Sequence, residues 1–315
     1  MAPLPPRPTI ATSIEMSPTI VRSARGELWA LGELLGTGAH GSVFAAARVT
    51  ASSALFTPGK PRLVIKLVLM AESEVIQNEQ RAARHPPSQH LCRLLDSFAH
   101  PSNLQFCFVY ERLEVTLEEV LRTNLRFDES HAFFHISLGV EAMHRAGLLH
   151  RDLKPANVMF CDGVGKLIDY GFSAPFGEDG PKAFAVPYRA PEIVTGGKCT
   201  EAGDAWALGV IAYEMATRKP LFAPPTHQTN EQLQESMEHI FGLRRGCLCG
   251  LVACGDDTAV GMPSIPQSQT TQRGVCAASA NALLIVSPRA RLEALRHLLP
   301  IAQRSDSATI NMQLN

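Results

Sequence analysis

The character of the sequence changes close to residue 114, and this change limits the chain to folds with two unlike halves. Before it, short apolar runs such as Leu63–Leu69 are separated by residues typical of turns, which predicts β-strands. After it, apolar side chains recur at helical spacing, for example from Phe133 to Met143. We therefore predict an α+β protein with a small β-rich lobe, about 28–113, and a larger, mainly helical lobe, about 114–300.

The ends of the chain and several connections lack these patterns. Residues 1–25 are rich in Pro, Ser and Thr and predict a disordered tail, and 301–315 are assigned to a second tail. Residues 51–61 carry turn-forming side chains and predict a surface loop, whereas 72–85 are compatible with a helix. Leu104–Leu113 predicts a pair of strands.

Composition disfavours several classes of function. The 315 residues carry a formal net charge of −1, so neither nucleic acid nor an anionic membrane is a favoured partner. No apolar run approaches the roughly 18 residues that span a bilayer, and the start of the chain lacks a secretory signal. Eight scattered cysteines then predict reduced thiols and a location in the cytoplasm or nucleus, of the host cell if the gene is viral.

Residues 36–41, Gly-Thr-Gly-Ala-His-Gly, lie between two strand-like runs. Glycine lets a backbone lie close over phosphate groups and direct amide hydrogens at them. A dinucleotide-binding turn needs a helix directly after the third glycine, but Val43–Ala46 continues as a strand. The motif alone is weak, yet its context favours a β-hairpin that covers a triphosphate.

Lys66 places a charge at the edge of an otherwise apolar strand. Such a lysine either reaches solvent or, beside a phosphate-binding loop, holds the phosphates. The second role needs a carboxylate partner, and Glu79 on the following polar helix is the best placed.

The densest set of reactive side chains is at residues 150–157, His-Arg-Asp-Leu-Lys-Pro-Ala-Asn. Phosphoryl transfer needs an oriented nucleophile, a cation near the transferred group and bound Mg²⁺. Asp152, Lys154 and Asn157 have side chains suited to these three roles. Asp169, which ends an apolar strand, is a second candidate ligand for Mg²⁺.

In this order the motifs resemble those of eukaryotic serine/threonine protein kinases over about residues 30–300. Residues 169–171, Asp-Tyr-Gly, resemble the family's metal-binding motif, and 190–192, Ala-Pro-Glu, resemble the end of its activation segment. The resemblance implies a two-lobed kinase fold, ATP and Mg²⁺ as cofactors, and protein substrates, with the oligomeric state left open. It also implies that Arg291 pairs with Glu192.

The same resemblance implies roles for individual residues. Asp152 accepts the proton of a serine or threonine hydroxyl, Lys154 neutralises developing charge, and Asn157 and Asp169 bind metal. Tyr110 falls at the gatekeeper position beside the adenine. The implied nucleotide-binding residues are Leu35, Gly36, Thr37, Gly38, Ala39, His40, Gly41, Ser42, Val43, Val64, Lys66, Glu79, Tyr110, Glu111, Leu113 and Met159.

Several positions depart from the family pattern. The interval between Lys66 and Glu79 is short, which predicts a trimmed helix or a trimmed loop before it. Ala185 replaces a threonine that ties the catalytic aspartate and lysine together, at a cost of about 1 kcal/mol of ordering. Tyr170 replaces a phenylalanine, so its hydroxyl needs a partner.

The activation segment raises a question of regulation. Arg151 is implied to grip a phosphate on this segment, but no hydroxyl residue lies at the usual position. We hypothesise that Glu178 and Asp179 substitute for the phosphate and make the enzyme constitutively active. A solvated acidic loop is the alternative.

Two other functions stay open. A pseudokinase that acts as a docking scaffold typically lacks Lys66, Asp152 or Asp169, and all three are present. A small-molecule kinase is disfavoured by the complete segment at 190–192, which shapes a ledge for peptides. Residues 188–192 and 219–222 lean weakly toward the branch of cyclin-dependent and MAP kinases.

Overall fold

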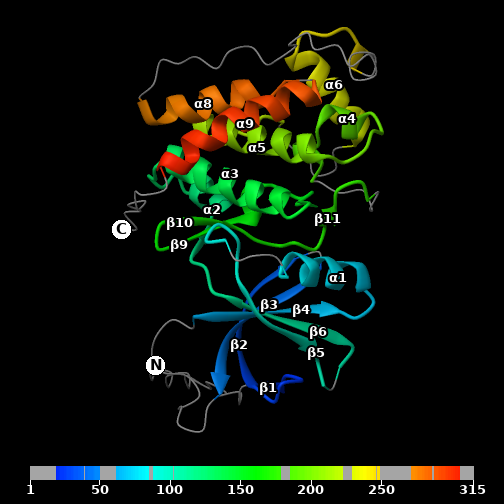
Figure 1. The fold of residues 1–315 in the computed structure, drawn as a ribbon, viewed down its shortest axis with the longest axis vertical. Helices are drawn as coiled ribbons and strands as arrows, with labels where there is room; N and C mark the ends of the chain where they lie inside the picture. The colour runs from blue at the N-terminus through cyan, green and yellow to red at the C-terminus, as the bar shows by residue number, and fades with distance from the viewer. Residues whose placement is uncertain are drawn as a thin grey trace, which may run out of the picture.

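The computed structural model describes residues 19–305, apart from 39, 50–61, 85–87, 102, 179–184, 223–228, 246, 249–270 and 286. The expected loop at 51–61 and most of both expected tails lie outside the described residues. The described chain forms a β-rich lobe, in the lower half of Figure 1, and a helical lobe above it. This arrangement confirms the predicted two-lobed α+β fold.

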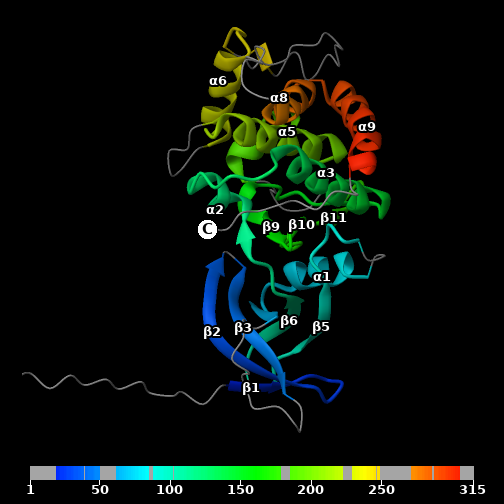
Figure 2. The same cartoon turned by 90° about the vertical axis from the view of Figure 1, so that its left-hand side faces the viewer.

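Six antiparallel strands form the sheet of the first lobe, in the order β1–β2–β3–β4–β6–β5. Their bounds are β1 Thr19–Arg22, β2 Leu28–Gly38, β3 Gly41–Val49, β4 Leu63–Leu69, β5 Leu94–Ala99 and β6 Gln105–Glu111. Successive side chains point to opposite faces, so Trp29 and Phe98 pack on one side, while Phe108 packs on the other. That second side is covered by α1 (Ser73–Ala82), which lies between the sheet and the helical lobe in both views (Figures 1 and 2).

Two predictions about strands are wrong. Residues 19–22, inside the expected disordered tail, form β1, which pairs with β2 and buries Val21 completely. Leu104–Leu113 contains the single strand β6, whose partner β5 lies earlier in the chain. Both errors have the same cause, because these strands are stabilised by pairing with a neighbouring strand and by packing into the core, and a short strand carries little of this signal itself.

The second lobe is built around α5 (Glu201–Thr217), which is buried on nearly every side. Such a helix has apolar residues all round rather than on one face, and α8 (Thr271–Leu283) and α9 (Pro288–Ser305) pack against it. The other helices are α2 Leu117–Arg122, α3 Glu129–Arg145, α4 Pro191–Val194 and α6 Asn230–Ile240. Because α9 continues to Ser305, the predicted boundary at residue 300 falls inside a helix.

Short strands of the second lobe carry the loops that face the first lobe. Strands β7 (Val115–Thr116), β9 (Val158–Cys161) and β10 (Val164–Leu167) form one small sheet. Strands β8 (Leu148–Leu149) and β11 (Ala174–Pro175) form another. No described helix has the length and apolar content needed to cross a membrane.

Candidate active site

A cleft of about 680 Å³ lies between the lobes. Most of the predicted nucleotide-binding residues line it, namely Leu35, Gly36, Thr37, Gly38, His40, Gly41, Val43, Val64, Lys66, Glu79, Tyr110, Glu111, Leu113 and Met159. Ser42 does not line the cleft, because its neighbours Gly41 and Val43 face it and side chains alternate along β3. Ala39 lies outside the described residues. Asn157 and Asp169 also line the cleft.

The hairpin between β2 and β3 covers one side of this cleft, and its glycines have different roles. Gly41 has φ of +148°, and a Cβ added there would lie 2.0 Å from the carbonyl oxygen of Leu67 in β4. Side chains are therefore excluded at Gly41 by the close approach of two strands. An added Cβ at Gly36 or Gly38 meets nothing within 4 Å, so these two glycines leave the space above the cleft open for a ligand.

Lys66 joins the two lobes by ion pairs. Its Nζ lies 2.5 Å from Glu79 Oε1 on α1 and 2.7 Å from Asp169 Oδ1 beyond β10. Burial alone lowers the pKa of Lys66, but the two carboxylates outweigh it and raise the pKa above its usual value. Conversely, burial raises the pKa of Asp169, but the charge and hydrogen bond of Lys66, together with the nearby His150 and His40, lower it below its usual value. Both side chains are therefore charged at neutral pH.

The short interval between Lys66 and Glu79 does not prevent this pairing. A sharp turn at Met70–Glu72 leads directly into the ten-residue helix α1. The trimmed connection that the sequence predicts is thus compatible with a helix that reaches the lysine.

The Asp152 side chain is held from three directions. Its Oδ2 accepts hydrogen bonds from Lys154 Nζ at 2.7 Å and from Asn157 Nδ2 at 2.8 Å. Its Oδ1 accepts one from the backbone N–H of Ala185 at 3.2 Å. The backbone of residue 185 thus supplies part of the tie that the missing threonine side chain was expected to provide.

A buried carboxylate supports the loop that carries Asp152. Asp204 on α5 accepts hydrogen bonds from the backbone N–H groups of His150 and Arg151 at 2.9 and 3.0 Å. His144 Nε2 lies 2.9 Å from the same carboxylate. Burial raises the pKa of Asp204, but His144, the nearby His150 ring and the backbone N–H of Arg151 together lower it below its usual value. The fixed charge holds Arg151 at φ of 66°, a conformation that is strained for a non-glycine residue.

Residues 29–273 match the protein kinase domain family. The chain belongs to this family. The match spans the hairpin, Lys66 and the loop of Asp152, and it agrees with the two-lobed fold and the cleft between the lobes.

Similar proteins are named as serine/threonine, cyclin-dependent and mitogen-activated kinases. Cyclin-dependent kinase D-1 from Arabidopsis thaliana is 33% identical over 202 residues, which cover 60% of this chain and 48% of the relative. Mitogen-activated protein kinase 1 from Oryza sativa subsp. japonica is 31% identical over 224 residues, with 65% and 53% covered. Cyclin-dependent kinase 7 from Dictyostelium discoideum is 35% identical over 152 residues, with 45% and 41% covered. The chain thus spans about half the length of the curated relatives it matches.

In this kinase domain, the segment that connects the two lobes is held in place by the side chain of one of its residues, Glu111. Glu111 Oε1 accepts hydrogen bonds from Lys166 Nζ at 2.7 Å and from the backbone N–H of Arg93 at 2.8 Å. These contacts occupy the carboxylate of Glu111, so the predicted contact of this residue with adenine would use its backbone groups.

The activation segment makes two notable contacts. Glu178 Oε2 lies 3.5 Å from the guanidinium of Arg81 on α1, and both side chains are substantially exposed; Asp179 lies outside the described residues. At the far end of the segment, Glu192 forms the predicted pair with Arg291, whose guanidinium also lies 5.3 Å from the Trp206 ring.

Sequence reasoning missed several residues that build the cleft. Asn78, next to Glu79 on α1, donates from Nδ2 to the carbonyl of Gly171 at 2.9 Å. Cys92 and Ile168 line the cleft beside Tyr170. In the sequence, Asn78 could be noticed only as a polar residue beside Glu79, because its hydrogen-bond partner Gly171 lies 93 residues away.

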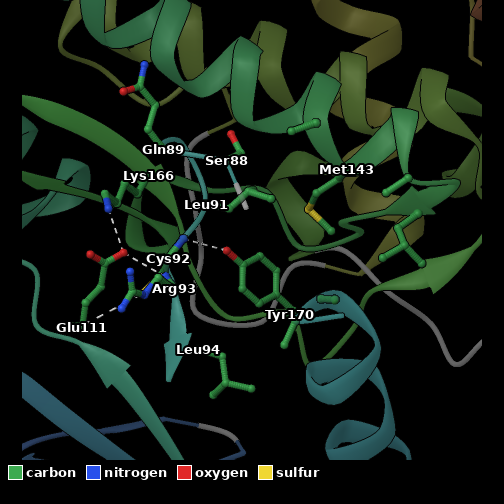
Figure 3. Close-up of a pocket in the computed structure, with 15 residues that line it drawn as sticks. Ser88, Gln89, Leu91, Cys92, Arg93, Leu94, Glu111, Met143, Lys166 and Tyr170 are labelled. Atoms are coloured by element: carbon green, nitrogen blue, oxygen red, sulfur yellow. Dashed lines mark hydrogen bonds and ion pairs between the residues drawn. The ribbon is translucent and has the colours of Figure 1, made fainter. Parts of the chain in front are cut away.

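A second cavity, of about 500 Å³, adjoins the first (Figure 3). It is lined by residues from the end of α1, from 88–94 and from α3. Cys92, Glu111 and Tyr170 border both cavities. These three residues therefore form a shared wall between the nucleotide cleft and the rear cavity.

Proposed function

We propose that this chain is an active serine/threonine protein kinase that transfers the γ-phosphate of ATP to hydroxyl groups of proteins. The observation that carries the proposal is the double ion pair of Lys66 with Glu79 and Asp169. It brings the phosphate-binding lysine and the metal-binding aspartate together from separate lobes. A scaffold that had lost catalysis would have no need to keep this arrangement.

The cleft suits a nucleotide with its metal. Asp169 and Asn157 offer oxygen atoms, which Mg²⁺ prefers, and the lowered pKa of Asp169 keeps its carboxylate anionic. When bound, Mg²⁺ supplies positive charge that offsets the charge of the phosphates. The open hairpin at Gly36 and Gly38 lets backbone amides approach those phosphates.

The proposed transfer assigns each remaining residue a step. The oxygen of a serine or threonine hydroxyl attacks the γ-phosphorus, and the bond to the bridging oxygen breaks, so ADP leaves. Asp152 orients that hydroxyl and accepts its proton. Lys154, 2.7 Å from Asp152, stabilises the negative charge that develops on the transferred group.

Phosphate transfer to a peptide library by the wild type and by Asp152→Asn tests this function. We expect the wild type to label serine- and threonine-containing peptides and Asp152→Asn to lose at least roughly a hundredfold in rate. Equal labelling by both proteins would remove Asp152 from its assigned role. Labelling by neither protein would favour the docking-scaffold function, and labelling of tyrosine alone would overturn the assigned substrate class.

A further inference from the structure

Two buried tyrosines lie behind the residues that bind phosphate and metal. We propose that the hydroxyl groups of Tyr110 and Tyr170 are positioning groups that hold Glu79 and Asp169, and through them Lys66, in the arrangement required for transfer. The inference rests on the proposed function of the cleft, and it adds two residues whose hydroxyls act through their neighbours.

Tyr170 belongs to the Asp-Tyr-Gly segment, and its hydroxyl contacts Cys92 in the 88–94 segment (Figure 3). It donates a hydrogen bond to the carbonyl of Leu167 at 2.7 Å and accepts one from the N–H of Cys92 at 2.9 Å. The same N–H lies 2.9 Å from the Leu167 carbonyl, so the contacts close a small network. A phenylalanine would form neither bond of the hydroxyl.

This network restrains the metal-binding carboxylate. Asp169 directly precedes Tyr170 and has φ of 61°, a conformation that is costly for aspartate. The Tyr170 ring is buried and packs edge-on against His150 at 5.9 Å. Turning Asp169 out of the cleft requires this ring to leave, which breaks two buried hydrogen bonds.

Tyr110 restrains the opposite side of the same ion pairs. Its hydroxyl donates to Glu79 Oε2 at 2.5 Å, while Glu79 Oε1 faces Lys66. Burial and the charge of Glu79 raise the pKa of Tyr110, which keeps the hydroxyl protonated and able to donate. Since Asn78 also binds Gly171, helix α1 is attached both to β6 and to the Asp-Tyr-Gly segment.

The alternative is that both tyrosines only fill space. Phenylalanine distinguishes the two cases, because it keeps the ring and removes the hydroxyl. Tyr213 on α5 provides a matched control, since it is partly buried and lies outside the cleft. We therefore compare Tyr110→Phe, Tyr170→Phe and Tyr213→Phe with the wild type.

Steady-state transfer to a peptide is measured over a range of ATP and Mg²⁺ concentrations. We expect kcat to fall about five- to tenfold in Tyr110→Phe and in Tyr170→Phe, as the loss of one or two buried hydrogen bonds predicts. The Mg²⁺ concentration at half-maximal rate should rise about threefold in Tyr170→Phe, and Tyr213→Phe should match the wild type. Unchanged kcat and Mg²⁺ dependence in both cleft variants would overturn the proposal.

Hydrogen exchange in the same four proteins separates this proposal from the proposed function. If the wild-type protein transfers no phosphate, the proposed kinase function is contradicted, but the positioning role of the two tyrosine hydroxyls is still tested by exchange. In that case, faster exchange of α1 in Tyr110→Phe and of residues 88–94 in Tyr170→Phe supports positioning. Exchange equal to that of Tyr213→Phe in both segments contradicts it.

Discussion

Ala185 reaches the catalytic aspartate only through its backbone amide. Ala185→Thr adds a hydroxyl near Asp152 and Lys154. One additional hydrogen bond from this hydroxyl would stabilise the ordered arrangement of the two side chains by about 1 kcal/mol. We expect kcat for peptide transfer to rise up to about fivefold, because 1 kcal/mol corresponds to that factor. Steady-state kinetics at saturating ATP measures the change.

Ala185→Val is the matched control for this substitution. Valine has nearly the shape of threonine but carries no hydroxyl, so a gain confined to threonine identifies the hydrogen bond as its cause. An equal rise in both variants would assign the gain to the β-branched backbone preference instead.

Glu214 is a buried carboxylate on α5 that faces Tyr188. Burial, together with the nearby Glu118, raises the pKa of Glu214 to about 7, although the Tyr188 hydroxyl donates to it at 3.1 Å. The raised pKa means that the folded protein binds this proton more tightly than the unfolded chain. The resulting stabilisation is complete below about pH 4.5 and is lost as the pH rises through 7.

Glu214→Gln removes this titration and keeps the size of the side chain. We expect the variant to be more stable than the wild type at pH 8, by on the order of 1–3 kcal/mol, and nearly equal to it at pH 5. Thermal unfolding at both pH values measures the difference. A stability difference that does not change with pH would show that another group is responsible.

Near its acidic residues, the activation segment also forms an ion pair with helix α1 at the surface. Glu178 contacts Arg81 across 3.5 Å, and pairs of this kind contribute at most about 1 kcal/mol. Glu178→Lys should therefore lower kcat by no more than about fivefold, a smaller effect than a true phosphate mimic would have.

Reversing the partner as well gives the control for this prediction. The double variant Glu178→Lys/Arg81→Glu restores opposite charges, so we expect it to regain most of the wild-type rate at low salt. If Glu178→Lys is as slow as Asp152→Asn, then the acidic segment has the phosphate-like role after all.

At the scale of elements, sequence patterns were informative where a segment carries its own period. The helix from Glu129 to Arg145 follows the spacing of its apolar residues and begins at an Asp128 cap. The helix that follows Thr116 begins where that side chain accepts a hydrogen bond from the N–H of Glu119, a cap whose residue types and spacing can be recognised in the sequence. Strand β1 escaped prediction because its four residues carry little local pattern, whereas pairing with β2 and the burial of Val21 stabilise it in the assembled lobe.

At the scale of the whole molecule, motif order identified which residues share the cleft, although it could not supply their contacts. Lys66 and Asp169 were both recognised, and they meet although 103 residues separate them. The hydroxyl of Tyr170 was expected to need a partner, but Cys92 could not be named because the 88–94 segment has no motif. Long-range contacts of this kind depend on the assembled lobes rather than on local pattern.

The pair between Arg291 and Glu192 has a consequence for synthesis of the chain. Arg291 lies 99 residues after Glu192, and both are buried in the finished lobe. At about 5–20 residues per second, the ribosome delivers the arginine roughly 5–20 seconds after the carboxylate. During that interval Glu192 lacks its counter-charge, so the nascent helical lobe cannot complete its buried ion pair until α9 has been synthesised.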